Sequence, residues 1–87
     1  MNHRVPIEDT LDLHAFLSRD VPSVVEEYVT EAHARGLAEV RFVHGRGIGV
    51  QRRAVQAVLE RRPLVVEFWD SPESRLGATV AQLAISS

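Results

Sequence analysis

The chain contains no cysteine and no lysine among its 87 residues, and each absence excludes a class of site. Without cysteine it has no disulfide framework and no cysteine-ligated zinc or iron–sulfur centre, so a nucleophile must come from water, a hydroxyl or the substrate. Without lysine a Walker-type phosphate loop is excluded. Apolar runs stay well below the roughly 20 residues of a bilayer span, and the amino-terminal residues lack a signal-peptide hydrophobic region. We therefore expect a cytoplasmic protein with no membrane partner.

The charge of the chain changes sign along its length. Residues 1–40 hold three arginines against eight acidic residues (−5), residues 41–62 hold six arginines against one glutamate (+5), and residues 63–87 hold one arginine against three acidic residues (−2), which together give the net charge of −2. This distribution favours a polyanion bound on one face with weak, salt-sensitive affinity. All ten cations are arginines, which suits bidentate phosphate contacts, although a bias toward GC-rich codons would give the same composition.

Hydrophobic periodicity predicts an α/β fold in one small domain over residues 7–87, with residues 1–6 as a flexible arm. Apolar residues recur at helical spacing from Val21 to Ala32, with Ser18, Asp20 and Pro22 as start signals and Gly36 as a stop. The second predicted helix covers residues 50–62, with a core side of Val50, Ala54, Val55, Val58 and Leu59, and the predicted strands cover residues 7–14, 39–44, 64–69 and 77–85.

The order of these elements predicts a two-layer βαβαββ sandwich in which a four-stranded mixed, mainly parallel sheet packs against two helices. Two strand–helix–strand units call for parallel strands, and the short last connection adds an antiparallel hairpin partner. Because the carboxyl ends of parallel strands lie at one edge, this edge is where we expect a ligand to bind.

The segment Val40–Gln51 is the most informative part of the chain. A strand-like run stops at His44, and Gly45, Gly47 and Gly49 follow at alternate positions before a helical pattern begins. Glycines between a strand and a helix amino terminus leave backbone N–H groups accessible to phosphate oxygens, and the helix dipole favours an anion there. The sequence therefore predicts a phosphate site with a histidine beside it.

Three side chains at strand ends are the candidate catalytic residues. Asp12 and His14 end the first predicted strand and His44 ends the second, so we expect them to converge beside the glycine loop. Two imidazoles and a carboxylate suit proton transfer at a phosphodiester. The candidate phosphate-binding residues are Gly45, Arg46, Gly47, Gly49, Arg52 and Arg53.

Plainer interpretations of these residues remain open. Asp12 can cap a helix or bond a neighbouring backbone group, a histidine at a strand end can be structural, and the glycines can serve a tight turn alone. Arg52 and Arg53 can form a solvated helix face, and Trp69 can pack at the sheet rim rather than stack on a base. The glycine spacing differs from the dinucleotide fingerprint. The three strand-end residues can also be interpreted as a two-His-one-carboxylate metal site.

Three short motifs follow one another along the chain: Leu11-Asp12-Leu13-His14, then His44-Gly45-Arg46-Gly47-Ile48-Gly49 with Arg52 after it, then Gly77-Ala78-Thr79-Val80. Together they resemble the small MutS-related (Smr) domain over about residues 11–83. The resemblance implies a βαβαββ sandwich similar to the C-terminal domain of a bacterial translation initiation factor, and an association with DNA or RNA binding and nicking endonuclease activity. It also implies that Asp12 and His14 form the acidic-histidine motif and that His44 begins the His-Gly loop.

We therefore expect a nucleic-acid-binding domain that nicks DNA or RNA by phosphodiester cleavage. In this hypothesis Asp12 fixes a histidine tautomer or helps to hold a metal, and His14 and His44 share the acid–base work. RNA supplies its own 2′-hydroxyl nucleophile, whereas DNA needs an activated water, for which a loosely held Mg²⁺ or Mn²⁺ would be the cofactor.

Two alternatives remain open at this point. One is a non-catalytic module that positions DNA or RNA for a partner protein or a larger parent chain, and the other is a binder of a small phosphorylated ligand. Ala15 and Ile48 stand where the family pattern commonly has Gly and Thr, and Ile48 removes a hydroxyl suited to a phosphate or a metal-bound water.

Overall fold

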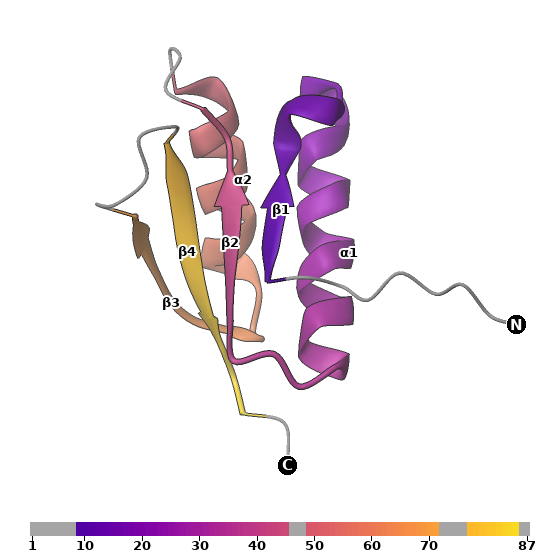
Figure 1. Ribbon diagram of the computed structural model, residues 1–87, viewed down its shortest axis with the longest axis vertical. Coiled ribbons are helices and arrows are strands. Elements are labelled where there is room, and N and C mark those ends of the chain that lie inside the picture. Colours follow the sequence, from indigo (N-terminus) through magenta and orange to yellow (C-terminus); the bar gives the residue numbers. More distant parts are fainter. Residues whose placement is uncertain (1–8, 46–48, 72–76, 86–87) are drawn as a thin grey trace, which may run out of the picture.

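One layer of the molecule is a four-stranded mixed sheet, and the other is a pair of helices on one face of that sheet (Figure 1). The computed structural model describes residues 9–45, 49–71 and 77–85, so the predicted arm lies outside the described residues. The predicted α/β two-layer sandwich is confirmed. The strands are β1 (Thr10–Asp12), β2 (Glu39–Val43), β3 (Val65–Asp70) and β4 (Ala78–Leu83), and the helices are α1 (Val21–Ala34) and α2 (Val50–Arg61).

The strand order is β1-β2-β4-β3, so β4 lies between β2 and β3. It pairs antiparallel with both, whereas β1 and β2 are parallel. The mixed sheet and the β3–β4 hairpin are confirmed. Three of the four strands, β1, β2 and β3, run in the same direction, as "mainly parallel" predicts, but two of the three strand pairings are antiparallel. The sequence of β4 fits this central place, since all of its residues except Gln82 are buried.

β1 is shorter than the strand predicted over residues 7–14. It ends at Asp12, and Leu13–Ala15 form a 3₁₀ turn in place of further strand. The Asp12 carboxylate accepts the backbone N–H of His14 at 2.9 Å, which caps the turn and ends the strand. Burial alternates with residue type, because Leu13 is fully buried while Asp12 and His14 are exposed.

Both helices lie where the periodicity places them. α1 has Pro22 in its first turn and Gly36 just beyond its end with a φ of 79°, a conformation that favours glycine. Asp20 is its N-cap residue, although the Asp20 side chain makes no capping hydrogen bond. α2 ends at Arg61, one residue earlier than predicted. Within the described residues, neither helix is long and apolar enough to cross a membrane.

The core lies between the helices and the sheet. Phe42 of β2 is fully buried, and its ring meets Tyr28 of α1 edge-on with centroids 5.5 Å apart. The prediction that Val50 faces the core is wrong, because this side chain is 52% exposed. Val50 lies five positions before the buried Val55, and at 100° per residue the two side chains point roughly 140° apart around the helix. The other buried residues of α2 are Val58 and Leu59.

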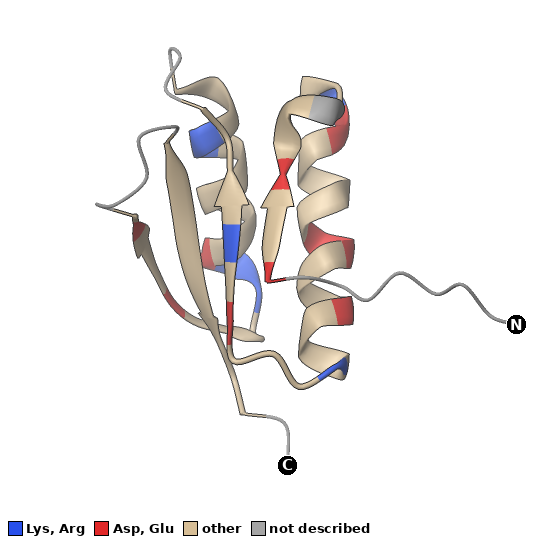
Figure 2. Ribbon diagram, in the orientation of Figure 1, with Lys and Arg blue, Asp and Glu red and all other residues tan. Residues whose placement is uncertain are grey.

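Acidic positions are spread along α1, whereas basic positions lie at both ends of α2 (Figure 2). At the carboxyl end of α2 the arginines tie the helices together: Arg61 donates to Glu26 at 3.2 Å, and Arg62 donates to the Thr30 hydroxyl at 2.8 Å. These two arginines, which belong to the positively charged residues 41–62, therefore serve the packing of α1 on α2.

The buried Phe42 ring should make a large contribution to stability. We expect Phe42→Ala to lower the free energy of unfolding by about 3–5 kcal/mol, since the substitution removes buried apolar area and leaves a cavity. Urea denaturation followed by circular dichroism measures the change. Phe16→Ala is the matched control, because the Phe16 side chain is 37% exposed and its loss should cost far less. Equal losses in the two variants would contradict the central role of Phe42.

Candidate functional site

The candidate site lies at the edge of the sheet where β1, β2 and β3 end and where both helices begin (Figure 1). The residues at this edge come from every layer: Asp12 ends β1, His44 follows β2, and Asp70 ends β3. The first turn of α2 adds Arg52. The parallel direction of the three strands is what gathers these distant parts of the sequence.

Asp12 and His14 form an exposed pair. The Asp12 Oδ1 atom accepts the His14 backbone N–H at 2.9 Å and lies 2.7 Å from His14 Nδ1, while the two side chains are 65% and 61% exposed. Two hydrogen bonds lower the pKa of Asp12: the larger effect comes from the His14 backbone N–H and the smaller from the His14 ring. An ionised carboxylate can only accept, so the neutral ring carries its proton on Nδ1 and leaves Nε2 as a base.

Gly45 meets the His14 ring. A Cβ built on Gly45 would lie 3.5 Å from His14 Nε2, and Gly45 has a φ of 86°, so a side chain there would strain the backbone. The expectation that His14 and the glycine loop are neighbours is confirmed. The Gly45 N–H does not face a phosphate, however, because it donates to the Gly77 carbonyl at 3.1 Å. Arg46 and Gly47 lie outside the described residues.

His44 is buried, with only 7% of its surface exposed. Its Nδ1 lies 3.0 Å from the Gly45 carbonyl oxygen, and its Nε2 lies 2.9 Å from the hydroxyl of Thr79 on β4. The structure thus brings His44 to the predicted edge, but both ring nitrogens already have partners. This differs from the expected sharing of acid–base work with His14, because His44 would have to give up a hydrogen bond before it could transfer a proton.

Arg52 is paired with Asp70 across the α2–β3 boundary. Its Nε and Nη2 donate to the two carboxylate oxygens at 2.8 and 2.6 Å, a bidentate geometry. The Arg52 guanidinium lowers the pKa of Asp70, and Asp70 raises the pKa of Arg52. Gln56, one turn further along α2, donates to Asp70 at 3.0 Å and to Thr79 at 3.1 Å. The expected phosphate ligand Arg52 therefore already holds an anion, the carboxylate of its own chain.

Sequence reasoning did not assign Gln56, Asp70 or Thr79 to the site. Two signals were present: Gln56 lies four residues after Arg52, which puts both on one face of a helix, and Thr79 lies within the third motif. Asp70 gave a weaker signal, because a single carboxylate at a strand end has many structural explanations.

Gly49 and Arg53 remain at the start of α2. Gly49 is the N-cap residue, with a φ of 85° and no side chain to cap the helix. The Arg53 N–H donates to the Gly49 carbonyl at 2.9 Å, so α2 itself supplies no acceptor for the N–H groups of the residues between them. The Arg53 side chain is exposed. Helix dipole, backbone donors and one exposed cation all favour an anion at this end.

The described residues do not form a divalent-cation site by themselves, since no three His, Asp or Glu side chains gather among them. Near the glycine turn, the Asp12 Oδ1 atom already accepts two hydrogen bonds from His14. The two-His-one-carboxylate interpretation fits this donor set poorly, because both nitrogens of His44 are occupied.

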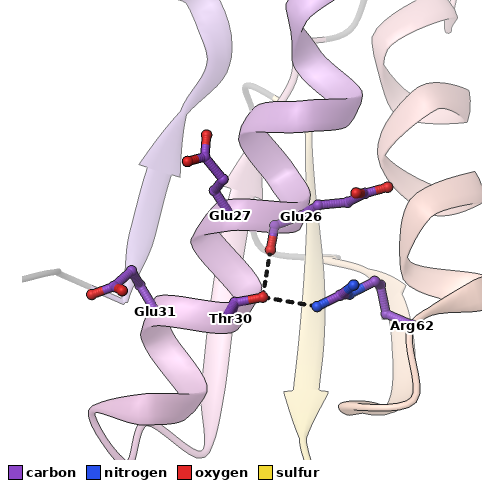
Figure 3. A pocket seen from close by; sticks show the side chains of 5 residues that line it. All are labelled: Glu26, Glu27, Thr30, Glu31 and Arg62. Atoms are coloured by element: carbon purple, nitrogen blue, oxygen red, sulfur yellow. Dashed lines mark hydrogen bonds between the residues drawn. The ribbon is translucent and has the colours of Figure 1, made fainter.

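A cavity of about 320 Å³ lies elsewhere, between α1 and the residue that follows α2 (Figure 3). Arg62 donates to the Thr30 hydroxyl, which in turn donates to the Glu26 carbonyl at 3.0 Å. Glu27 and Glu31 complete its lining. Three carboxylates against one arginine would repel a phosphate, so this cavity does not compete with the strand-end edge as a nucleic-acid site.

Comparison with known proteins places the geometry in context. The family model of the Smr domain matches residues 11–84. Endonuclease MutS2 of Caldicellulosiruptor saccharolyticus is 34% identical over 79 residues, which are 88% of this chain and 10% of that protein, and Endonuclease MutS2 of Clostridium tetani is 32% identical with the same coverage. The chain thus spans about a tenth of the length of the curated relatives it matches.

Two solved structures have the same fold. The Smr domain of Thermus thermophilus MutS2 superposes with a TM-score of 0.80 at 32% identity, covering 88% of this chain and 99% of that one. YdaL, a stand-alone small MutS-related protein from Escherichia coli, superposes with a TM-score of 0.79 at 22% identity, covering 93% of this chain and 68% of that one. Sequence match, structural match and motif order agree, and the chain belongs to the Smr domain family.

Proposed function

We propose that this Smr domain binds DNA or RNA and nicks its phosphodiester backbone. The observation that carries the proposal is the exposed Asp12–His14 pair, in which His14 Nε2 lies beside Gly45 and has no hydrogen-bond partner among the described residues. A free imidazole nitrogen is the usual group for removing a proton near neutral pH. The relatives named endonucleases support the same reaction class.

His14 acts as the general base in this proposal. Its Nε2 takes a proton from the nucleophile, which is the 2′-hydroxyl of RNA or a water molecule on DNA. The nucleophile oxygen bonds to phosphorus as the bond from phosphorus to the leaving sugar oxygen breaks, and the leaving oxygen takes its proton from water. Asp12 holds the ring with its proton on Nδ1 and stabilises the imidazolium that forms, as a carboxylate beside a catalytic histidine does. The amino terminus of α2 and the Arg53 side chain bind the phosphate.

The second candidate function is a non-catalytic DNA- or RNA-binding module that positions nucleic acid for a partner or a larger chain. The observation that favours it is the buried His44, since only His14 of the two strand-end histidines is left exposed. In this case the amino terminus of α2 binds phosphate in the same way, but no turnover follows.

Removal of either member of the pair should abolish cleavage with little loss of binding. We expect Asp12→Asn and His14→Ala each to slow cleavage by about 10²–10⁴-fold, the usual contribution of a positioned general base. The assay uses supercoiled plasmid, labelled single-stranded DNA and labelled structured RNA, each with Mg²⁺, Mn²⁺ or EDTA. His33→Ala is the matched control, because His33 lies in the last turn of α1 and should be dispensable.

Two outcomes of this assay would contradict the nuclease proposal. Variants that cleave as fast as wild type would remove Asp12 and His14 from the mechanism. Wild-type protein that shifts the oligonucleotides on a gel but cleaves none of them would establish the binding module.

The two arginines of the first turn of α2 should differ in their effect on binding. We expect Arg53→Ala to reduce the slope of log affinity against log salt by about one, since one phosphate contact is lost. Arg52→Ala should reduce it less, because Asp70 already neutralises the Arg52 guanidinium. Fluorescence anisotropy over a salt series measures both slopes. Arg35→Ala at the end of α1 serves as the control, and an unchanged slope in Arg53→Ala would place the nucleic acid on another surface.

A further inference from the structure

A continuous chain of hydrogen bonds runs beneath the glycine turn. It starts at Arg52 on α2, passes to Asp70 on β3, returns to Gln56 on α2, continues to Thr79 on β4 and reaches His44 after β2. Every donor–acceptor distance in it lies between 2.6 and 3.1 Å. The chain therefore links one helix and three strands at the same edge.

The direction of each hydrogen bond follows from the chemistry of its partners. Asp70 can only accept, so the Gln56 amide turns its nitrogen toward it, and the second N–H of that nitrogen donates to the Thr79 oxygen. The Thr79 hydroxyl then has its own proton left to donate to His44 Nε2.

The other side of His44 requires the same proton arrangement. A carbonyl oxygen only accepts, so the 3.0 Å contact with Gly45 needs a proton on His44 Nδ1. With Nδ1 donating to the Gly45 carbonyl and Nε2 accepting from Thr79, the hydrogen bonds at both ring nitrogens match the neutral Nδ1–H tautomer of His44.

We propose that Thr79, Gln56 and Asp70 are positioning residues of the cleavage site. Their hydrogen bonds hold His44 as the neutral tautomer whose proton lies on Nδ1, and this proton fixes the carbonyl of Gly45. The cleavage role of these residues rests on the proposed function, whereas their effect on the His44 tautomer does not.

The fixed position of Gly45 is what presents the site to substrate. Gly45 is held at its carbonyl by His44 and at its N–H by the Gly77 carbonyl, so neither polar group is left to move independently. Its α-carbon faces His14 Nε2, the proposed base. A shift of Gly45 would therefore displace the His14 ring beside it relative to the substrate phosphate, and a displacement of about 1 Å is enough to cost roughly a hundredfold in rate.

Burial makes Thr79 the member whose removal is most informative. Thr79 is fully buried, so loss of its hydroxyl leaves His44 Nε2 and one Gln56 N–H without the partner they have in the wild type. Thr79→Val removes the hydroxyl at nearly constant shape, whereas Thr79→Ser retains it. Thr30→Val is the matched control, because Thr30 also bonds through its hydroxyl but belongs to the cavity between the helices.

The tautomer of His44 is measured by long-range ¹H–¹⁵N NMR of the imidazole at neutral pH, with resonances assigned by comparison with His3→Ala, His14→Ala and His33→Ala proteins. We expect the Nδ1–H tautomer in wild type, Thr79→Ser and Thr30→Val, and an increased Nε2–H population in Thr79→Val. Gln56→Leu, at a half-buried position, should shift the tautomer in the same direction and serves as the second variant if Thr79→Val does not fold. A wild-type Nε2–H tautomer, or no shift in either variant, would overturn the inference.

Cleavage measured on the same proteins tests the link to function. We expect Thr79→Val to lower the rate of cleavage by roughly ten- to a hundredfold with nearly unchanged affinity for the oligonucleotide, and Thr79→Ser to restore it. Full activity in a Thr79→Val protein whose tautomer has shifted would overturn the positioning role. Wild-type protein that cleaves no substrate would instead refute the proposed function, and the tautomer measurement would still decide whether these residues hold His44.

Discussion

β4 hydrogen-bonds to a strand on each side, and the remaining elements depend on this central position. It joins two parts of the chain that are each incomplete alone, the β1–α1–β2 unit and the α2–β3 unit. Its backbone groups are paired along both edges, and its side chains include Ala81 and Leu83 of the core. Small side chains suit this place, because residues of both neighbouring strands and the helices pack over them.

The residues at the start of the same strand build the floor of the candidate site. The Gly77 carbonyl, just before β4, accepts the N–H groups of both His44 and Gly45 at 3.1 Å. Two residues later, Thr79 meets the imidazole of His44. This explains in physical terms why the third motif accompanies the first two: it supplies the acceptor and the hydroxyl that hold the glycine turn.

Two histidines at equivalent strand ends have opposite environments. His14 lies on the turn that follows β1, where Asp12 engages one ring nitrogen and no described residue bonds the other. His44 follows β2 beneath the glycine turn and is enclosed by β4, so both of its nitrogens are engaged. The same side chain therefore suits proton transfer at one strand end and structural support at the other. In the proposed function, this asymmetry separates the base, His14, from the residue that supports Gly45.

Several features of the molecule follow from local sequence alone. The periodicity of residues 21–34 is sufficient for α1, because an amphipathic helix is specified by residues three and four positions apart. The glycine turn and the beginning of α2 follow in the same way, since Gly45 and Gly49 adopt positive φ values that other residues disfavour. The gathering of Asp12, His14 and His44 at one edge also follows, because parallel strands end together.

Only the tertiary structure decided the rest. The placement of β4 between β2 and β3 depends on pairing between segments that are far apart in the sequence, and no local pattern encodes such a partner. The pairing of Arg52 with Asp70 and the hydrogen bonds of His44 arise from the same non-local packing. Residue types and their spacing thus determined which groups are present at the edge, whereas long-range strand pairing determined which of them are buried and which can meet a substrate.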